Sequence, residues 1–249
     1  MDFDHYTLAA LFFLVAVLYS SVGHAGASGY LAAMALLGFA PEQMRPTALA
    51  LNILVGGIGL YRYNKANFVP WEKVLPFVIA SIPCAYFSAQ WKIPKETYSM
   101  LLAGLLLVAS IGSWRSGIII ERVGESLTSK SIPIYIALLI GAAIGCLSGI
   151  TGTGGAIFLT PLLLFFSWAH TREASGLSVA FVWLNSIAAI IGLLKSNQTL
   201  PDALLLWLVA VALGAIVGTQ LGIHRLPTYQ LRKGLAIVLL IAVGKLLIS

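Results

Sequence analysis

The chain has 249 residues, of which 59% are hydrophobic and only 10% are charged, and its mean hydropathy is +0.93. Soluble domains carry about 25% charged residues, so this chain lacks the polar surface that a soluble protein of its size needs. The formal net charge is +6, but Lys and Arg occur singly or in small groups between apolar runs, which excludes a nucleic-acid-binding patch. The composition therefore predicts a polytopic membrane protein.

The N-terminus and the cysteines exclude several other classes. Asp2 and Asp4 stand where a secretory signal peptide needs basic residues, so we expect the first apolar run to be retained. Cys84 and Cys146 lie inside apolar runs and indicate neither a disulfide nor a metal site. We expect no metal and no cofactor.

Apolar segments follow one another along the whole chain. Most approach the roughly 20 residues that a membrane span requires, whereas the second and the seventh are shorter, and Pro161 interrupts the seventh. The segments cover residues 7–22, 29–40, 47–61, 74–91, 97–114, 132–150, 155–169, 176–194, 203–223 and 235–249. The pattern predicts an all-α fold with 8–10 membrane segments.

The segments form two sets of five that match in order, which indicates an internal duplication. The predicted repeats are residues 1–120 and 132–249, joined by a polar linker at 121–131. The matched positions are Gly23, Gly26 and Gly29 with Gly149, Gly152 and Gly155, then Arg45 with Arg172, Pro70 with Pro201, and Pro94 with Pro227. An odd number of crossings in each half would make the second half an inverted copy of the first.

The distribution of Lys and Arg predicts the orientation of such an inverted pair. If every segment changes sides, ten of the 15 Lys and Arg residues fall on one side and five on the other. The richer side is then cytoplasmic, and both termini are external. If the short segments do not change sides, the count is eight against seven and favours neither orientation.

Two glycine-rich stretches begin the short segments, SVGHAGASGYLAA at Ser21–Ala33 and SGITGTGGAIFLTP at Ser148–Pro161. Irregular backbone at membrane depth is tolerated where it is buried in protein or lines a watery cavity. Short glycine-interrupted segments at matching places in two halves indicate a transporter's binding site. Each break also exposes the first N–H groups of the next helix, which favour an anion. We therefore expect broken or re-entrant helices near the midplane that bind an anionic substrate.

The predicted substrate-binding residues are the glycines and hydroxyls of these stretches with a few polar residues elsewhere. They are Ser20, Ser21, Gly23, His24, Gly26, Ser28, Gly29, Asn52, Ser148, Gly149, Thr151, Gly152, Thr153, Gly154, Gly155, Ser178 and Asn185. For any single glycine, the alternative is close helix packing. For Asn52, Asn185 and Gln220, the alternative is a hydrogen bond to a neighbouring helix.

Three charged or titratable residues have further predicted roles. His24 is the only histidine inside an apolar region, so it is either a proton carrier or a neutral hydrogen-bonded side chain. Arg45 and Arg172 precede the third segment of each half. They are either gates that attract anions or ordinary loop cations.

The duplicated pattern, the stretch GITGTGGAIFLTPLL and the following REASGLSVAF resemble the TauE/SafE family of sulfite and organosulfonate exporters, also called the toluene-sulfonate uptake permease family. The resemblance covers nearly the whole chain, although GHAGASG in the first half departs from the more glycine-dense pattern. It implies an integral membrane protein with duplicated halves that moves a small sulfur-containing anion.

We therefore expect a secondary transporter of sulfite or an organosulfonate that works by alternating access in a bacterial inner membrane. The rival hypotheses are an intramembrane enzyme, with His24 and Ser148 as its only pair, and a non-transporting scaffold subunit. The stretch GLSVA lacks the second glycine of a nucleophile elbow, and GTGG lacks the lysine of a phosphate loop. Enzyme activity is therefore not expected. Proton coupling, the direction of transport and a homodimer are left open.

Overall fold

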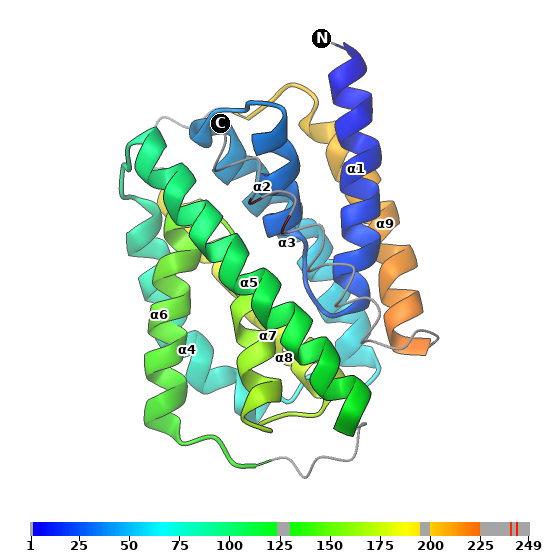
Figure 1. Cartoon of the computed structure of the whole chain (residues 1–249), viewed down its shortest axis with the longest axis vertical. Helices are drawn as coiled ribbons and strands as arrows, with labels where there is room; N and C mark the ends of the chain where they lie inside the picture. The colour runs from blue at the N-terminus through cyan, green and yellow to red at the C-terminus, as the bar shows by residue number, and fades with distance from the viewer. Residues whose placement is uncertain (1, 124–129, 195–199, 225–239, 241–242, 244–249) are drawn as a thin grey trace.

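The computed structural model describes residues 2–123, 130–194, 200–224, 240 and 243 (Figure 1). In these residues the chain is all-helical. The helices are α1 (Asp2–Ser21), α2 (Ala27–Leu36), α3 (Pro41–Lys65), α4 (Trp71–Ala89), α5 (Lys95–Val123), α6 (Ile134–Thr151), α7 (Ala156–Phe165), α8 (Thr171–Leu193) and α9 (Leu204–His224). The predicted tenth segment, 235–249, lies outside the described residues except for Leu240 and Val243.

The helices have the length and surface of a membrane protein. Among the described residues, three helices are long and apolar enough to cross a bilayer: Ile134–Thr151, Thr171–Leu193 and Leu204–Ile223. Large apolar side chains also face outward, including Ile79, Leu139 and Leu205. Water would disfavour such a surface and lipid would not. The prediction of an all-α polytopic membrane protein is confirmed.

The two halves of the chain run in opposite directions. In Figure 1, α1 runs downward from the end that carries the N-terminus, here called the upper end, whereas α6 runs upward from the opposite, lower end. The short helices α2 and α7 turn back toward the end from which α1 and α6 began, so each forms a hairpin with its predecessor. This is the arrangement of inverted repeats. The exact boundaries of the repeats stay a prediction.

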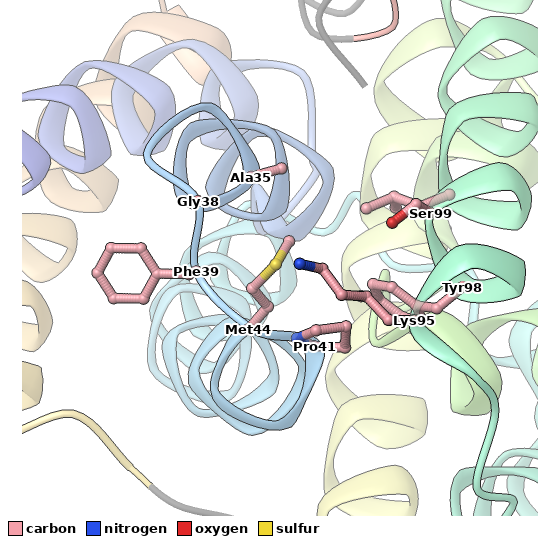
Figure 2. A pocket seen from close by; sticks show the side chains of 9 residues that line it. Ala35, Gly38, Phe39, Pro41, Met44, Lys95, Tyr98 and Ser99 are labelled. Carbon is pink, nitrogen blue, oxygen red and sulfur yellow. The ribbon is translucent and has the colours of Figure 1, made fainter. Parts of the chain in front are cut away.

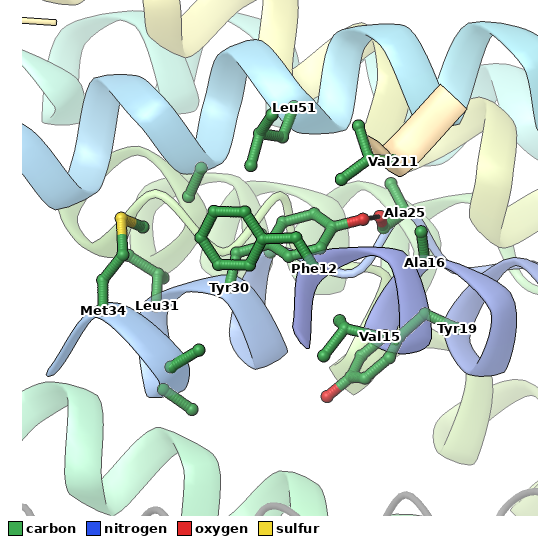
Figure 3. Close-up of a cluster of buried hydrophobic side chains, with 14 of the residues drawn as sticks. Phe12, Val15, Ala16, Tyr19, Ala25, Tyr30, Leu31, Met34, Leu51 and Val211 are labelled. Carbon is green, nitrogen blue, oxygen red and sulfur yellow. Dashed lines mark hydrogen bonds between the residues drawn. The ribbon is translucent and has the colours of Figure 1, made fainter. Parts of the chain in front are cut away.

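Two hydrophobic clusters each combine helices from both halves. One cluster contains residues of α1, α2 and α3 together with Trp207, Val211 and Ala215 of α9. The other contains residues of α6, α7 and α8 together with Val74 and Phe77 of α4. Each half therefore places its fourth helix in the core formed by the other half. Figure 3 shows part of the first cluster, with Phe12 of α1, Tyr30 of α2 and Val211 of α9.

Glycine stripes bring these exchanged helices together. A Cβ atom on Gly141 of α6 would lie 2.2 Å from the carbonyl oxygen of Phe77 in α4. A Cβ atom on Gly145 would lie 2.4 Å from the carbonyl oxygen of Ser81, also in α4. On α9, Gly218 and Gly222 approach α1 in the same way. Because glycine lacks a side chain, the backbones of these helices can touch. The spacing of four residues keeps the glycines on one face of each helix.

Two details differ from the sequence-based expectations. Pro161 does not interrupt the seventh segment, since α7 continues from Ala156 to Phe165 through it. A buried membrane helix tolerates a proline when its neighbours compensate for the lost hydrogen bond, and Gly112 of α5 makes room beside this ring. In addition, α5 extends to Val123, into the predicted linker at 121–131.

Candidate functional site

Two interruptions of helix lie inside the protein. The first break, residues 22–26, separates α1 from α2, and the second break, residues 152–155, separates α6 from α7. Both are buried throughout. Positive φ angles, which residues with a Cβ atom rarely adopt, occur at Gly23 (78°), Gly26 (104°), Gly152 (79°), Gly154 (75°) and Gly155 (84°). The glycines of both stretches therefore produce the breaks that the sequence predicted.

The second break presents a row of unused backbone donors. Gly155 caps α7 without a side-chain hydrogen bond, and its carbonyl oxygen accepts from Phe158 and Leu159. Within the described part of the chain, no acceptor takes a hydrogen bond from the N–H groups of residues 153–157. Buried N–H groups are nearly always paired, so this run of donors indicates a place for a negatively charged or strongly polar ligand.

Unpaired polar side chains surround the same break. The Ser148 hydroxyl and the Asn52 side-chain oxygen are fully buried and have no hydrogen-bond partner. Both residues are close to the break, because a Cβ on Gly154 would lie 2.6 Å from Asn52 Nδ2 and a Cβ on Gly155 would lie 3.6 Å from Ser148 Cβ. Asn52 Nδ2 donates to Ser186 Oγ at 3.3 Å. The structure thus brings α3, α6 and α8 together around one polar centre.

Arg45 supplies a buried positive charge beside this centre. Its side chain is 6% exposed, and Nη2 donates to the carbonyl oxygens of Ala89 and Gly149, both at 2.9 Å. A Cβ on Gly152 would lie 3.3 Å from Arg45 Cα. Arg45 Nε is buried without a partner. The guanidinium therefore holds the ends of α4 and α6 together and retains one unused donor.

Arg172, which the sequence pairs with Arg45, lies in a different environment. It is exposed, and its guanidinium carbon lies 5.3 Å from the centroid of the Phe68 ring. Ser175 of α8, and not Arg172, lies against the first break. A Cβ on Gly23 would lie 2.4 Å from Ser175 Cβ, and Ser175 Oγ donates to the Val22 carbonyl oxygen at 2.9 Å. The two breaks are therefore unequal, since among the residues that the structure describes only the second break has a buried Lys or Arg beside it.

The first break carries a histidine and a chain of hydroxyls. His24 is 4% exposed, and its Nε2 lies 2.7 Å from Thr160 Oγ1. Thr160 Oγ1 lies 2.5 Å from Ser178 Oγ and donates to the Ala156 carbonyl oxygen at 3.2 Å. Ala156 is the residue that follows the second break. His24 is thus joined to the second break through one turn of α7, so the two breaks lie near each other, as predicted.

The remaining predicted residues have mainly local contacts. Ser20 Oγ, Ser21 Oγ and Thr151 Oγ1 donate to carbonyl oxygens of their own helices. Ser28 Oγ donates to the Tyr19 hydroxyl, and Thr153 Oγ1 lies 3.0 Å from Thr151 Oγ1.

Two of the predicted glycines serve helix packing. Gly29 fits against Val15 and Tyr19, and Gly149 fits against Ala85 and Ser88. Asn185 donates to the Phe181 carbonyl oxygen, and its own side-chain oxygen is buried without a partner.

Sequence reasoning missed Thr160, Ser175 and Ser186, which contact the breaks from α7 and α8. Each is a small hydroxyl residue in an apolar segment. Such residues usually bond to their own backbone, so nothing in their local sequence distinguishes them.

Two cavities lie at opposite ends of the bundle. The upper cavity, about 60 Å³, lies between the α2–α3 connection and the start of α5 and is lined by Met44, Lys95, Tyr98 and others. Figure 2 shows the Lys95 side chain extending from α5 toward Met44. The lower cavity, about 340 Å³, is lined by Arg62, Lys65, Ala66, Gln220 and Ile223. Neither is lined by residues of a break, so both breaks are closed off from these two cavities.

Comparisons with known proteins agree with a transport role. The profile of the family described as "Sulfite exporter TauE/SafE" matches residues 8–246. The chain is 39% identical over 247 residues to a probable membrane transporter protein, y4hK, of Sinorhizobium fredii, an alignment that covers 99% of this chain and all of that protein. It is 26% identical over 153 residues to a probable membrane transporter protein of Methanocaldococcus jannaschii, covering 61% of this chain and 55% of that protein. No solved structure gives a significant match.

Proposed function

Because this chain belongs to the sulfite exporter TauE/SafE family and is an integral membrane transporter, we propose that it carries a small sulfur-containing anion, sulfite or an organosulfonate, across a bacterial cell membrane by alternating access. The observation that supports this proposal most directly is the row of unpaired N–H groups at residues 153–157. Buried donors without partners are costly, and an oxyanion would satisfy several of them at once.

The second break has the chemistry to hold such an anion. The N–H groups stand at the N-terminus of α7, where the helix dipole favours negative charge. The Ser148 hydroxyl adds a donor, and the Arg45 guanidinium adds a full positive charge in a site with little water. No carboxylate is buried among the described residues, and Glu42, whose carboxylate interacts electrostatically with Arg45, is exposed. We propose that two or three anion oxygens bind these donors together.

The inverted arrangement provides a way for the site to change sides. The two breaks are buried, and the two cavities lie at opposite ends of the bundle. We propose that the two hydrophobic clusters move against each other around the breaks, so that each end opens in turn. Figure 1 shows that α3 and α5 end, and α4, α6 and α8 begin, at the lower end. The Lys and Arg residues in or next to these helix ends are Arg62, Lys65, Lys73, Arg115, Arg122, Lys130 and Arg172. Fewer described Lys and Arg residues belong to the helix ends on the upper side, namely Arg45, Lys92 and Lys95, so we propose that the lower end is cytoplasmic.

His24 is our candidate for proton coupling. It is buried in the first break and contacts Thr160, which donates to the carbonyl oxygen of Ala156, the residue that follows the second break. Addition of a proton there would attract the anion. The enzyme hypothesis has no comparable support, because the Ser148 hydroxyl has no hydrogen-bond partner and is not activated by His24.

Two measurements on purified protein test the proposal. Sulfite, sulfonates, sulfate, thiosulfate and carboxylates are first compared for their ability to raise the melting temperature, because a ligand that binds only the folded protein stabilises it by mass action. The preferred anion is then used for flux in liposomes that contain only this chain, which also tests the scaffold hypothesis. Gly152→Leu and Gly155→Leu should abolish flux. Wild-type flux in both variants would remove the assignment of the site, and absence of flux in the wild type would remove the transport proposal.

A further inference from the structure

Two buried tyrosines hold the ends of the two broken helices. The Tyr98 hydroxyl, from α5, donates to the carbonyl oxygen of Thr151 at 3.0 Å. Thr151 is the last residue of α6, directly before the second break. The Tyr63 hydroxyl, from α3, donates to the carbonyl oxygen of Ser21 at 3.3 Å, and Ser21 is the last residue of α1, directly before the first break. Each helix that ends at a break is therefore tied to a tyrosine from another helix.

Each of these tyrosines stands beside one of the two cavities. Tyr98 itself lines the upper cavity, together with Met44 and Lys95 (Figure 2). Tyr63 lies between Arg62 and Lys65 in α3, and both of those residues line the lower cavity. On the other wall of the lower cavity is Gln220 of α9. Two residues further along α9, Gly222 packs directly against the carbonyl oxygen of Ser21. Tyr98 thus connects the upper cavity to the end of α6, and Tyr63 connects the segment of α3 that lines the lower cavity to the end of α1.

Both cavities carry positive charge, although they open at opposite ends. The Lys95 side chain projects across the upper cavity, and Arg62 and Lys65 contribute to the lower one. Arg62 is also fixed in place, because Nη1 donates to Thr219 Oγ1 at 2.9 Å. Cations at the mouth of a low-dielectric passage raise the local concentration of anions.

We propose that Tyr98 and Tyr63 are the two gates of a single anion path, which leads from the upper cavity through the second and the first break to the lower cavity. This inference rests on the proposed transport function and adds its two entrances and the residues that close them. Each gate opens when one hydroxyl leaves a helix-end carbonyl. A neutral hydrogen bond contributes only about 1 kcal/mol net, so thermal motion breaks it readily. The freed hydroxyl then donates to the passing anion.

Tyr30 provides a matched control. Its hydroxyl donates to the Ala25 carbonyl oxygen of the first break at 2.9 Å, as Figure 3 shows. It is fully buried in the hydrophobic cluster and lines neither of the two cavities. Tyr30→Phe therefore removes the same kind of hydrogen bond without opening a path from either cavity.

Cysteine labelling from each side of the membrane tests the gates. Cys84 and Cys146 are replaced by alanine, and a single reporter is introduced in α6 beside the second break, Ser148→Cys, or at the end of α1 before the first break, Ser21→Cys. The probe is 2-sulfonatoethyl methanethiosulfonate, an anionic thiol reagent that does not cross membranes, added to vesicles of known orientation.

Tyr98→Phe should raise the labelling rate at Ser148→Cys about fivefold, the factor that corresponds to loss of one neutral hydrogen bond, and only from the upper side. Tyr63→Phe should do the same at Ser21→Cys, only from the lower side. Tyr30→Phe should change neither rate. The proposal is overturned if either gate variant changes both reporters from both sides, or if neither variant changes its own reporter.

A second variant keeps the test valid if a gate variant folds poorly. Lys95 is exposed, so Lys95→Gln should leave folding intact. It should slow labelling of Ser148→Cys from the upper side by the anionic reagent, and leave labelling by a neutral reagent of similar size unchanged. An equal effect on both reagents would show that the upper cavity does not conduct anions to the break. The assay needs no transported substrate, so these outcomes are independent of the flux measurement.

Discussion

Replacing Gly154 by alanine separates the backbone strain of the second break from its close packing. Gly154 has φ +75°, and an added Cβ would lie 2.3 Å from Val182 Cγ2 and 2.6 Å from Asn52 Nδ2. Gly38 has nearly the same φ, +77°, but no atom lies within 4 Å of an added Cβ. Gly104 lies in α5, also without a neighbour within 4 Å, and has no positive φ. Gly154 therefore combines a positive φ with close neighbours, Gly38 has the positive φ alone, and Gly104 has neither.

The expected changes in stability follow from these environments. A Cβ in the left-handed region costs about 1–2 kcal/mol, and forcing extra atoms into a packed site costs a further 1–3 kcal/mol, roughly. Gly154→Ala should thus lower the free energy of unfolding by about 2–5 kcal/mol. Gly38→Ala should lower it by no more than about 1 kcal/mol, because alanine also restricts the unfolded chain. Gly104→Ala should raise it by about 0.5–1 kcal/mol through helix propensity.

Thermal unfolding in detergent and flux in liposomes measure the two effects. Gly154→Ala should melt lowest of the three and lose at least tenfold in flux, because any shift of the backbone at 154 misaligns the N–H groups that follow it. Gly38→Ala and Gly104→Ala should keep wild-type flux. If Gly154→Ala has the same melting temperature as Gly38→Ala and transports normally, the second break is neither tightly packed nor the anion site.

Three further changes test other parts of the structure. Arg45→Met should lower the free energy of unfolding by about 2–6 kcal/mol, because the carbonyl oxygens of Ala89 and Gly149 lose their donor at a cost of roughly 1–3 kcal/mol each, and it should reduce flux at least tenfold. The exposed Arg172→Ala should change the free energy of unfolding by less than about 0.5 kcal/mol; equal effects of the two variants on melting and flux would contradict the assignment. His24→Gln keeps a hydrogen-bonding group but cannot carry a proton, so flux should persist while its response to an imposed pH gradient disappears; an unchanged response would exclude His24 as the carrier. Gly145→Leu should prevent α6 from packing on α4 and leave little monodisperse protein on size-exclusion chromatography, while the outward-facing Leu139→Ile should elute normally.

The sequence predicted the breaks because their cause is local. A run such as TGTGG disfavours helix wherever it stands, since glycine gains conformational freedom outside a helix, and the structure has its irregular backbone at residues 152–155. The matching of Arg45 with Arg172 in the sequence did not predict their different surroundings, because these depend on other helices. Burial of Arg45 depends on carbonyl oxygens of Ala89 and Gly149, which belong to other helices. No spacing within α3 or α8 carries that information.

Composition and the length of the apolar runs predicted a helical membrane protein, because lipid requires every span to satisfy its own backbone hydrogen bonds, and the matched glycines, arginines and prolines predicted its two halves. They also located the two short helices at α2 and α7. Only the tertiary structure decided that the fourth helix of each half packs in the other half's core. Glycine stripes at residues 141–149 and 214–222 are visible in the sequence, but a smooth helix face fits many partners. Which partner is chosen, and hence which polar groups meet around the second break, depends on the packing of all the helices together.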